Sequence, residues 1–290
     1  MGAGRIAFAG SGGLIGGAVL PGLESKYEVV RLKHRRIGEW PSLVDGAHAV
    51  INLAGAPIAE KRWTPRRKKE LIQSRLGATR ALVDAMAQAK DRPKVFLSAS
   101  AVGYYGAHGD ETLDEASPAG SGFLADLCRE WERQALKARA HGVRVVLLRT
   151  GIVLSPRGGA LAKMLPLFRL GLGGPMGSGR QWMSWIHIDD EVGGIHKALE
   201  DGSIQGPVNL TAPDPVSMGG FARTLGKTLH RPALFPVPGF ALKLLLGEMS
   251  GMLLTGQRVR PGKLLAGGFS FRYPTLESSL VDLLGAIRSA

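Results

Sequence analysis

Short apolar runs alternate with longer segments of helical periodicity over most of the chain. The apolar runs contain few polar positions and no regular alternation, which is typical of strands buried on both faces of a parallel sheet. They cover residues 6–9, 28–32, 49–54, 95–98 and 143–148, with 208–210 as a late addition. This rhythm predicts an α/β fold, a Rossmann-type doubly wound parallel sheet with helices on both faces.

Two helices are predicted between these strands. The segment "TPRRKKELIQSRLGATRALVDAMAQA" has Thr64 as its expected N-cap and Pro65 at the first helical position, followed by apolar residues at helical spacing. A second helix is expected from about residue 122 to 140. From Pro213 onward prolines interrupt short apolar segments such as "FALKLLLGEM", which indicates a smaller C-terminal lobe.

Charge and cysteine content narrow the picture only slightly. The formal net charge of +13 suits nucleic acid, an anionic membrane or a phosphorylated ligand, and it selects none of them. Cys128 is the only cysteine, so no internal disulfide is possible. Because no apolar run reaches the roughly 18 residues of a membrane helix and no leader pattern opens the chain, we expect a soluble, cytoplasmic protein.

A glycine-rich segment follows the first strand and carries the main functional signal. Glycines at 10, 13 and 16 form G-x-x-G-x-x-G, whereas the G-x-G-x-x-G pattern fails because its last position is Ile15. Such glycines permit a tight turn, close approach of a pyrophosphate and a helix packed on the sheet. The turn therefore predicts dinucleotide binding, the alternative being an ordinary loop. The residues expected to contact the cofactor here are Gly10, Ser11, Gly12, Gly13, Leu14, Ile15 and Gly16.

The end of the second strand predicts which dinucleotide is bound. An acid at this position would hydrogen-bond the ribose of NAD. The segment "EVVRLKHRRIGE" has no acid between Glu28 and Glu39, and it offers basic side chains. These favour the 2′-phosphate of NADP(H); the alternative is a solvated basic loop. The expected contacts are Arg31, His34, Arg35 and Arg36.

Several longer segments resemble a known family. They are "INLAGAPI", "RWTPRRKKELIQSRLGATRALV", "SASAVGYYG", "VVLLRTGIVL", "FRLGLGGPMGSGRQWMSWIHIDD" and "GQRVRPGKLLAGGFSFRYPTLESSL". With these the chain resembles the extended short-chain dehydrogenase/reductase superfamily, and within it an atypical NAD-dependent epimerase/dehydratase-like subfamily of unassigned substrate. The resemblance implies further cofactor contacts at Leu53, Ala54, Gly55, Arg75, Ser98 and Gly151.

The resemblance also implies a division of the chain. An NADP-binding Rossmann domain is expected at residues 1–154 and 180–212, and a small substrate-side lobe at 155–179 and 213–290. The chain departs from the subfamily at Gly12, where threonine is usual, at Pro21 inside the first helix, and in the short stretch between Arg36 and Ala47. These departures predict a looser turn, a short or kinked first helix and a vestigial third strand.

The catalytic residues of the superfamily are only partly present. Its members use a Tyr as acid/base, a Lys four residues later and a Ser that positions the reacting oxygen. Ser100 matches the Ser, but none of the four tyrosines has a Lys four positions on, and the matching helix positions hold Phe123 and Leu127. Tyr104 and Tyr105 are the expected substitutes, with structural packing as the alternative.

Four residues are candidates for substrate contact. Arg180, Gln181 and Trp182 follow a glycine-rich loop and offer a cation, an amide and a flat apolar surface, and His187 resembles a position beside the substrate site of the subfamily. Cys128 has the setting of a core thiol. No His, Cys and carboxylate cluster has metal-ligand spacing, so no metal is expected. The basic residues within 62–69 are interpreted as solvent-exposed side chains at the N-terminus of a helix.

The sequence thus favours an NADP(H)-dependent oxidoreductase or epimerase that acts on a small carbonyl or hydroxyl substrate. Because the Tyr/Lys pair is missing, catalysis itself stays open. The alternative is a catalytically weak, nucleotide-sensing protein of the cell-division-linked kind. Neither nucleic acid nor a membrane is an expected partner, since no nucleic-acid-binding motif accompanies the charge, and the oligomeric state is not predicted.

Overall fold

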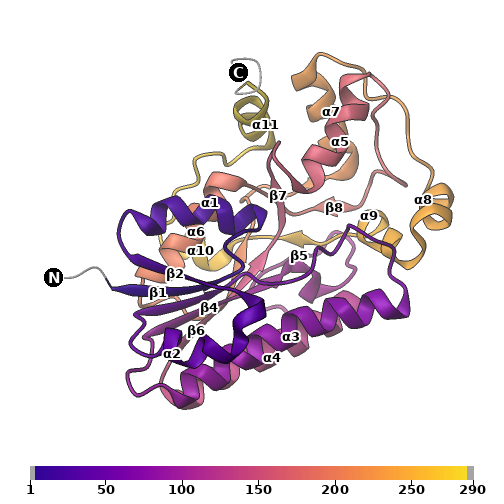
Figure 1. Ribbon diagram of the computed structural model, residues 1–290. Coiled ribbons are helices and arrows are strands. Elements are labelled where there is room, and N and C mark those ends of the chain that lie inside the picture. Colours follow the sequence, from indigo (N-terminus) through magenta and orange to yellow (C-terminus); the bar gives the residue numbers. More distant parts are fainter. Residues whose placement is uncertain (1–3, 286–290) are drawn as a thin grey trace.

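The computed structural model describes residues 4–285 and has a six-stranded parallel sheet at its centre (Figure 1). The strand order is β10-β6-β4-β3-β1-β2, and every neighbouring pair is parallel. The strands are β1 (Arg5–Ala9), β2 (Glu28–Leu32), β3 (Ala49–Asn52), β4 (Val95–Ala101), β6 (Arg144–Thr150) and β10 (Gly206–Leu210). The predicted doubly wound fold is confirmed.

Helices cover both faces of this sheet (Figure 1). Alternate residues of β1 point into two separate cores, Ile6 and Phe8 into one, Ala7 and Ala9 into the other. The first core is closed by α1 (Leu14–Glu24) and α6 (Ile188–Glu200), and the second by α2 (Trp40–Val44), α3 (Pro65–Gln88) and α4 (Phe123–Leu136). All six strands therefore end at one edge, where parallel sheets place their ligands.

The predicted helices and strands are close to the observed ones, with two corrections. Thr64 caps α3 by accepting a hydrogen bond from the amide of Arg67, as expected. The first helix is not shortened by Pro21: α1 runs three residues beyond it, to Glu24. Between β2 and β3 the chain forms a 3-10 helix, η1 (His34–Glu39), and the short α2, with no strand. The expected vestigial third strand is thus absent from this segment.

Many of the remaining elements lie beyond the carboxyl edge of the sheet (Figure 1), while the short 3-10 helix before β6 lies at the amino edge. Three two-stranded sheets pair β5 with β12, β7 with β9, and β8 with β11. Their strands are β5 (Thr112–Leu113), β7 (Ile152–Leu154), β8 (Trp182–Met183), β9 (Trp185–His187), β11 (Val216–Ser217) and β12 (Arg258–Val259). The helices are η2 (Val102–Tyr105), η3 (Lys137–His141), α5 (Gly159–Arg169), α7 (Met218–Leu229), α8 (Gly239–Leu246), η4 (Gly247–Ser250), α9 (Gly251–Leu254), α10 (Gly262–Ala266) and α11 (Leu276–Gly285).

The sheet takes its strands from residues 5–150 and 206–210, while 155–179 and most of 213–285 add short peripheral elements. The predicted two-part division stays a prediction, and its first three and last five residues lie outside the described range. Within residues 4–285 no helix combines the length and apolar character needed to cross a membrane.

Candidate cofactor and catalytic site

The turn between β1 and α1 is closed by very tight backbone contacts. Gly10 has a φ of +90°, and a Cβ there would lie 2.4 Å from the carbonyl carbon of Leu53. A Cβ on Gly16 would lie 2.2 Å from the carbonyl oxygen of Gly10. The amide of Gly13 donates to that same oxygen at 3.2 Å. Larger residues at positions 10 and 16 would force the turn apart, so these two glycines are needed by the fold itself.

The outer side of this turn is open. A Cβ on Gly12 would meet no atom within 4 Å, and one on Gly13 would lie 3.6 Å from its nearest neighbour. No side chain caps α1 and no acid lies in its first turn. Within the described residues the amides of Leu14, Ile15 and Gly16 show no hydrogen-bond partner. Free amides, a helix N-terminus and bare backbone together fit the pyrophosphate of a dinucleotide.

Basic side chains lie at the carboxyl end of β2, next to this turn. Arg31 is paired with Glu24 at 2.7 Å. His34, Arg35 and Arg36 begin η1 and are exposed, and Arg36 lies 3.5 Å from Glu39. Because η1 holds three basic groups against one acid, it keeps a positive surface where the ribose of a bound dinucleotide is expected.

The chain leaving β3 forms the next side of the site. The amide of Leu53 donates to Ala9, which fixes the end of β3 against the end of β1. The Ala54 amide donates to Asn52 Oδ1 at 3.2 Å. Arg75 packs on Gly55, where a Cβ would lie 3.1 Å from the guanidinium carbon. Burial lowers the pKa of Arg75, and its charge faces the same edge of the sheet.

Two other predicted cofactor contacts lie deeper. Ser98 is fully buried within β4, and its hydroxyl donates to the neighbouring Ala99 carbonyl at 3.5 Å. Gly151 follows β6 and donates its amide to Leu210, while a Cβ there would lie 2.4 Å from the carbonyl oxygen of Ser184. The side chain of Ser98 therefore cannot reach a ligand, and Gly151 is required by close strand packing.

A buried polar network occupies the place where the catalytic groups were expected. Ser100 donates to Glu132 at 2.6 Å, and Glu132 accepts two hydrogen bonds from Arg149, at 2.8 and 2.9 Å. Arg149 also donates to the Tyr105 hydroxyl at 3.0 Å, and Tyr105 donates to Asn209 at 2.7 Å. Helix α4 is thereby joined to strands β4, β6 and β10.

Ser100 and Tyr105 are both engaged in this network, and the catalytic roles predicted for them stay predictions. Tyr105 is 0% exposed, and burial raises its pKa to about 12 even though Arg149 acts in the opposite direction. Ser100 is 5% exposed, and its only donor proton is used on Glu132. Burial opposes the charge on Arg149, but hydrogen bonds to Glu132 outweigh it and raise the pKa of Arg149. Both hydroxyls satisfy buried charges in this network.

Tyr104 is the one predicted catalytic residue that stays partly exposed. It lies on η2, directly after β4, with the Arg149 guanidinium 3.5 Å from its ring centroid. Within the described residues its hydroxyl shows no hydrogen bond. The structure therefore places a free phenol at the carboxyl edge of the sheet.

Helix α4 offers no substitute for the missing Tyr/Lys pair. Phe123 packs against Trp63 at 5.0 Å between ring centroids, and Leu127 is buried. Cys128 is buried too, and burial raises the pKa of its thiol to about 12. The predicted core role of Cys128 agrees with this placement.

Two of the four predicted substrate residues are engaged inside the protein. His187 is 1% exposed, accepts a hydrogen bond from the Asp189 amide as the N-cap of α6, and stacks on Tyr273. Burial lowers the pKa of His187. The Gln181 amide donates both to Met176 and to Leu253. His187 thus caps a helix and Gln181 links two loops, while their expected substrate contacts stay predictions.

The other two substrate candidates stay at the surface. Trp182 donates to Asp110 at 2.7 Å, and Arg258 lies 4.5 Å from its ring. Arg180 is exposed, and only its backbone amide is bonded, to Ser178. Trp182 thus connects β8 to the loop after Tyr105, which keeps it a candidate beside Tyr104.

Sequence reasoning missed the partners that bury these groups. Glu132 follows Cys128 by four residues and precedes Ala135 by three, so it lies on the apolar side of α4. A charge at such a position is the signal that would have revealed the network. Glu191 is a second case: it is fully buried, accepts a hydrogen bond from Thr150 at 2.8 Å, and leaves Oε2 without a partner.

Stability is expected to fall as the pH rises, because of Glu191. Burial raises its pKa to about 8, well above the value of an unfolded glutamate. Between about pH 4.5 and 8 the unfolded chain releases this proton while the folded protein keeps it, which favours unfolding. Glu191→Gln should remove this part of the pH dependence.

Urea unfolding at pH 5 and pH 8 measures the effect. The wild type should lose more stability across the interval than Glu191→Gln. Glu200→Gln, on the exposed side of the same helix, serves as the control and should behave like the wild type. If the free energy of unfolding changes equally between pH 5 and pH 8 in all three proteins, Glu191 is not the titrating group.

Comparison with known proteins agrees with this geometry. Residues 6–210 match the NAD dependent epimerase/dehydratase family, and residues 237–283 match a domain of unknown function, DUF1731. The chain is 49% identical over 244 residues to "Epimerase family protein SDR39U1 homolog, chloroplastic" of Arabidopsis thaliana, covering 83% of this chain and 70% of the relative. An epimerase family protein of Mycobacterium bovis is 41% identical, with 95% and 96% of the two chains covered.

A solved structure is similar over almost the whole chain. The human epimerase family protein SDR39U1 (isoform 2), crystallised with NADPH, superposes with a TM-score of 0.91 at 34% identity. The match covers 97% of this chain and 99% of the human one. UDP-glucose 4-epimerase of Thermotoga maritima, at 17% identity and a TM-score of 0.78, shares the fold.

Proposed function

The chain belongs to the NAD dependent epimerase/dehydratase family, and from that premise we propose that it is an oxidoreductase that binds NADP(H) and reduces a small carbonyl compound. The open, uncapped turn at Gly12 carries the proposal, because it offers free amides to a pyrophosphate. The basic start of η1 supports the phosphorylated dinucleotide. The human relative crystallised with NADPH adds to this support.

When bound, NADPH supplies the hydride. The first amides of α1 would hold the pyrophosphate, and His34, Arg35 and Arg36 would hold the 2′-phosphate. Tyr104 lies at the same carboxyl edge of the sheet, directly after β4 and beside Arg149 of β6. Tyr104 donates the proton that the reduced carbonyl oxygen takes up. The buried network beneath it keeps η2 in place.

We expect NADPH to bind at least tenfold more tightly than NADH, a difference of about 1.4 kcal/mol. The double variant Arg35→Asp, Arg36→Asp should abolish the preference, because it puts two acids where the 2′-phosphate is held. Titration of both dinucleotides by calorimetry measures the ratio. Lys90→Asp, Arg92→Asp makes the same charge change just before β4, at the opposite edge of the sheet, and should leave the preference intact. Equal affinities in the wild type would contradict the assignment.

Tyr104→Phe is expected to lower kcat by about a hundredfold or more, the usual contribution of a general acid. NADPH oxidation with the best substrate from a panel of aldehydes, ketones and quinones provides the assay. Because the phenol of Tyr104 serves as a proton donor, reduction should exceed the reverse oxidation. Tyr105→Phe is the matched control. It should lower the thermal midpoint, because it removes a buried hydrogen bond. It should lower kcat far less than Tyr104→Phe does.

An unchanged rate in Tyr104→Phe would refute the role of this phenol. Tight NADPH binding with no turnover on the whole panel would contradict the oxidoreductase proposal itself. The sensing interpretation would then explain the missing Tyr/Lys pair.

A further inference from the structure

The most exposed large apolar side chains gather on one part of the small lobe. Within the described residues, the five with the highest exposure are each between 68% and 80% exposed. We call them the apolar surface: Leu170, Leu234, Phe240, Leu244 and Leu245. Exposed apolar residues scattered singly need no explanation, but a concentration of this kind marks an interaction site.

Backbone contacts join the two segments that lie between Leu170, Leu234 and helix α8. Residues 173–177 run beside 235–237: Val237 donates to Pro175 at 2.9 Å, and Gly177 donates to Val237 at 2.9 Å. Leu170 and Leu234 precede these paired segments, and α8 follows them directly. Figure 1 shows α8 at the outer edge of the molecule, away from the central sheet.

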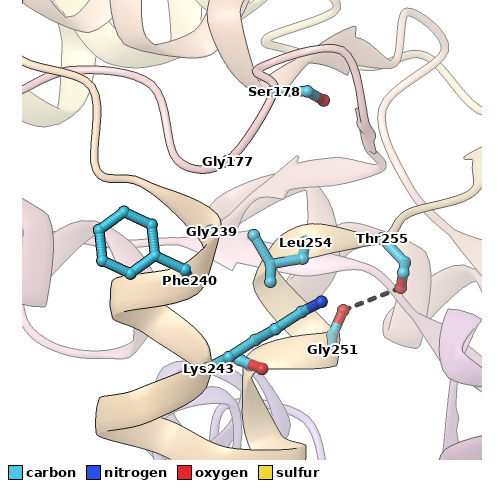
Figure 2. A pocket seen from close by; sticks show the side chains of 9 residues that line it. Gly177, Ser178, Gly239, Phe240, Lys243, Gly251, Leu254 and Thr255 are labelled. Atoms are coloured by element: carbon cyan, nitrogen blue, oxygen red, sulfur yellow. Dashed lines mark hydrogen bonds between the residues drawn. The ribbon is translucent and has the colours of Figure 1, made fainter.

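Helix α8 itself is poorly covered. Only Leu242 of its eight residues is buried. A cavity of about 510 Å³ lies between α8, α9 and the loop at Gly177, and Figure 2 shows Phe240, Lys243 and Leu254 around it. A helix that exposes two of its four leucines and its phenylalanine to water carries a hydrophobic cost, which contact with an apolar phase would remove.

The charges around the apolar surface have one sign. Residues 155–188 and 215–247 contain no Asp or Glu, and each stretch contains four Lys or Arg residues. Two acids from other elements are engaged nearby: Glu277 pairs with Lys227, and Glu248, just after α8, pairs with Lys68 of α3. Arg169, Arg231 and Lys243 thus surround the apolar side chains without an acid from these two segments.

We propose that the apolar surface docks this protein on an anionic lipid membrane. Apolar side chains flanked by Lys and Arg are the pattern of helices that lie in a membrane interface, where anionic headgroups attract the cations and the acyl boundary takes up the apolar groups. A second copy is a poorer fit, because its own cationic surface would be repelled. The sequence-based expectation of no membrane partner considered membrane-spanning segments, and it did not consider this surface.

Flotation of the full-length protein with vesicles tests the proposal. The wild type should float with phosphatidylcholine vesicles that contain phosphatidylglycerol, and it should stay behind with pure phosphatidylcholine. Phe240→Ser, Leu244→Ser, Leu245→Ser should weaken binding about tenfold or more. Leu265→Ser, Val281→Ser removes exposed apolar side chains elsewhere and should bind like the wild type.

Two further measurements test the role of the basic side chains and the insertion of α8 into the membrane. Arg169→Gln, Lys243→Gln should weaken vesicle binding more than Lys90→Gln, Arg92→Gln, which removes the same charge from the opposite edge of the sheet. A single Phe240→Trp variant reports insertion through a blue shift of its fluorescence with anionic vesicles. NADPH affinity confirms that each variant is folded.

Three results would overturn the proposal: no flotation of the wild type with either vesicle, flotation that the triple serine variant retains in full, or no fluorescence shift in Phe240→Trp on bound vesicles. A concentration-dependent dimer in sedimentation, lost in the triple variant without any lipid binding, would assign the surface to a second copy instead.

Discussion

Gly13→Ala is expected to weaken NADPH binding about a hundredfold, or about 2.7 kcal/mol, without lowering the stability of the apoprotein. A Cβ at this position would lie 3.6 Å from its nearest neighbour, an ordinary contact, so the folded chain accommodates it. The same Cβ would stand in the space that the pyrophosphate must enter to reach the free amides of α1. The loss corresponds to one or two charge-assisted hydrogen bonds. Calorimetric titration and thermal unfolding measure the two effects separately.

Two neighbouring glycines provide matched comparisons. Gly16→Ala should lower both binding and stability, because its Cβ would collide with the Gly10 carbonyl oxygen 2.2 Å away. Gly17→Ala should leave binding unchanged, since its nearest neighbour is 4.0 Å away, and alanine is the better helix former. If Gly13→Ala binds NADPH like the wild type, the pyrophosphate does not lie on this turn.

Glu132→Gln is expected to destabilise the fold by about 3–5 kcal/mol. The substitution leaves the guanidinium of Arg149 buried, 3% exposed, without its carboxylate. It also disturbs the hydrogen bonds that Ser100 and Tyr105 make within the same network. Urea unfolding, followed by fluorescence, gives the free energy of unfolding.

The same helix contains an exposed counterpart for comparison. Glu130 accepts two hydrogen bonds from Arg133, at 2.7 and 2.8 Å, but the pair is open to solvent. Glu130→Gln should cost less than about 1 kcal/mol. The double variant Glu132→Leu, Arg149→Met should recover part of the loss, because no unpaired charge remains. If Glu130→Gln and Glu132→Gln lower the free energy of unfolding by similar amounts, burial of the Glu132–Arg149 pair does not explain its contribution to stability.

Local patterns in the chain predicted the sheet and the glycine-rich turn well. Apolar runs mark the buried strands because both faces of each strand are covered, and Gly16 reports a contact with Gly10, which is close in sequence. Thr64 and Pro65 likewise mark the start of α3 through a purely local cap. These features depend on neighbours along the chain, which is why they can be read without a structure.

The catalytic residues could not be predicted in this way. Ser100 and Tyr105 owe their burial to Glu132 and Asn209, which lie 32 and 104 residues further along the chain. The neighbouring sequence does not show that Tyr105 is buried while the adjacent Tyr104 is partly exposed. The segment "FALKLLL" misleads in the opposite direction: its composition is that of a core helix, yet the fold leaves Phe240 and Leu244 in solvent.

The pairing of β5 with β12 has a consequence for how the protein is made. β5 follows η2, which carries Tyr104, but its partner at Arg258–Val259 leaves the ribosome roughly a hundred residues after β6, which takes about 5–20 s at ordinary rates of synthesis. The nascent chain can therefore assemble the five strands β1 to β4 and β6 early, while the segment after Tyr104 waits for the last tenth of the sequence. Closing so long a loop is entropically slow, so the glycine-rich turn is expected to form before the surroundings of Tyr104.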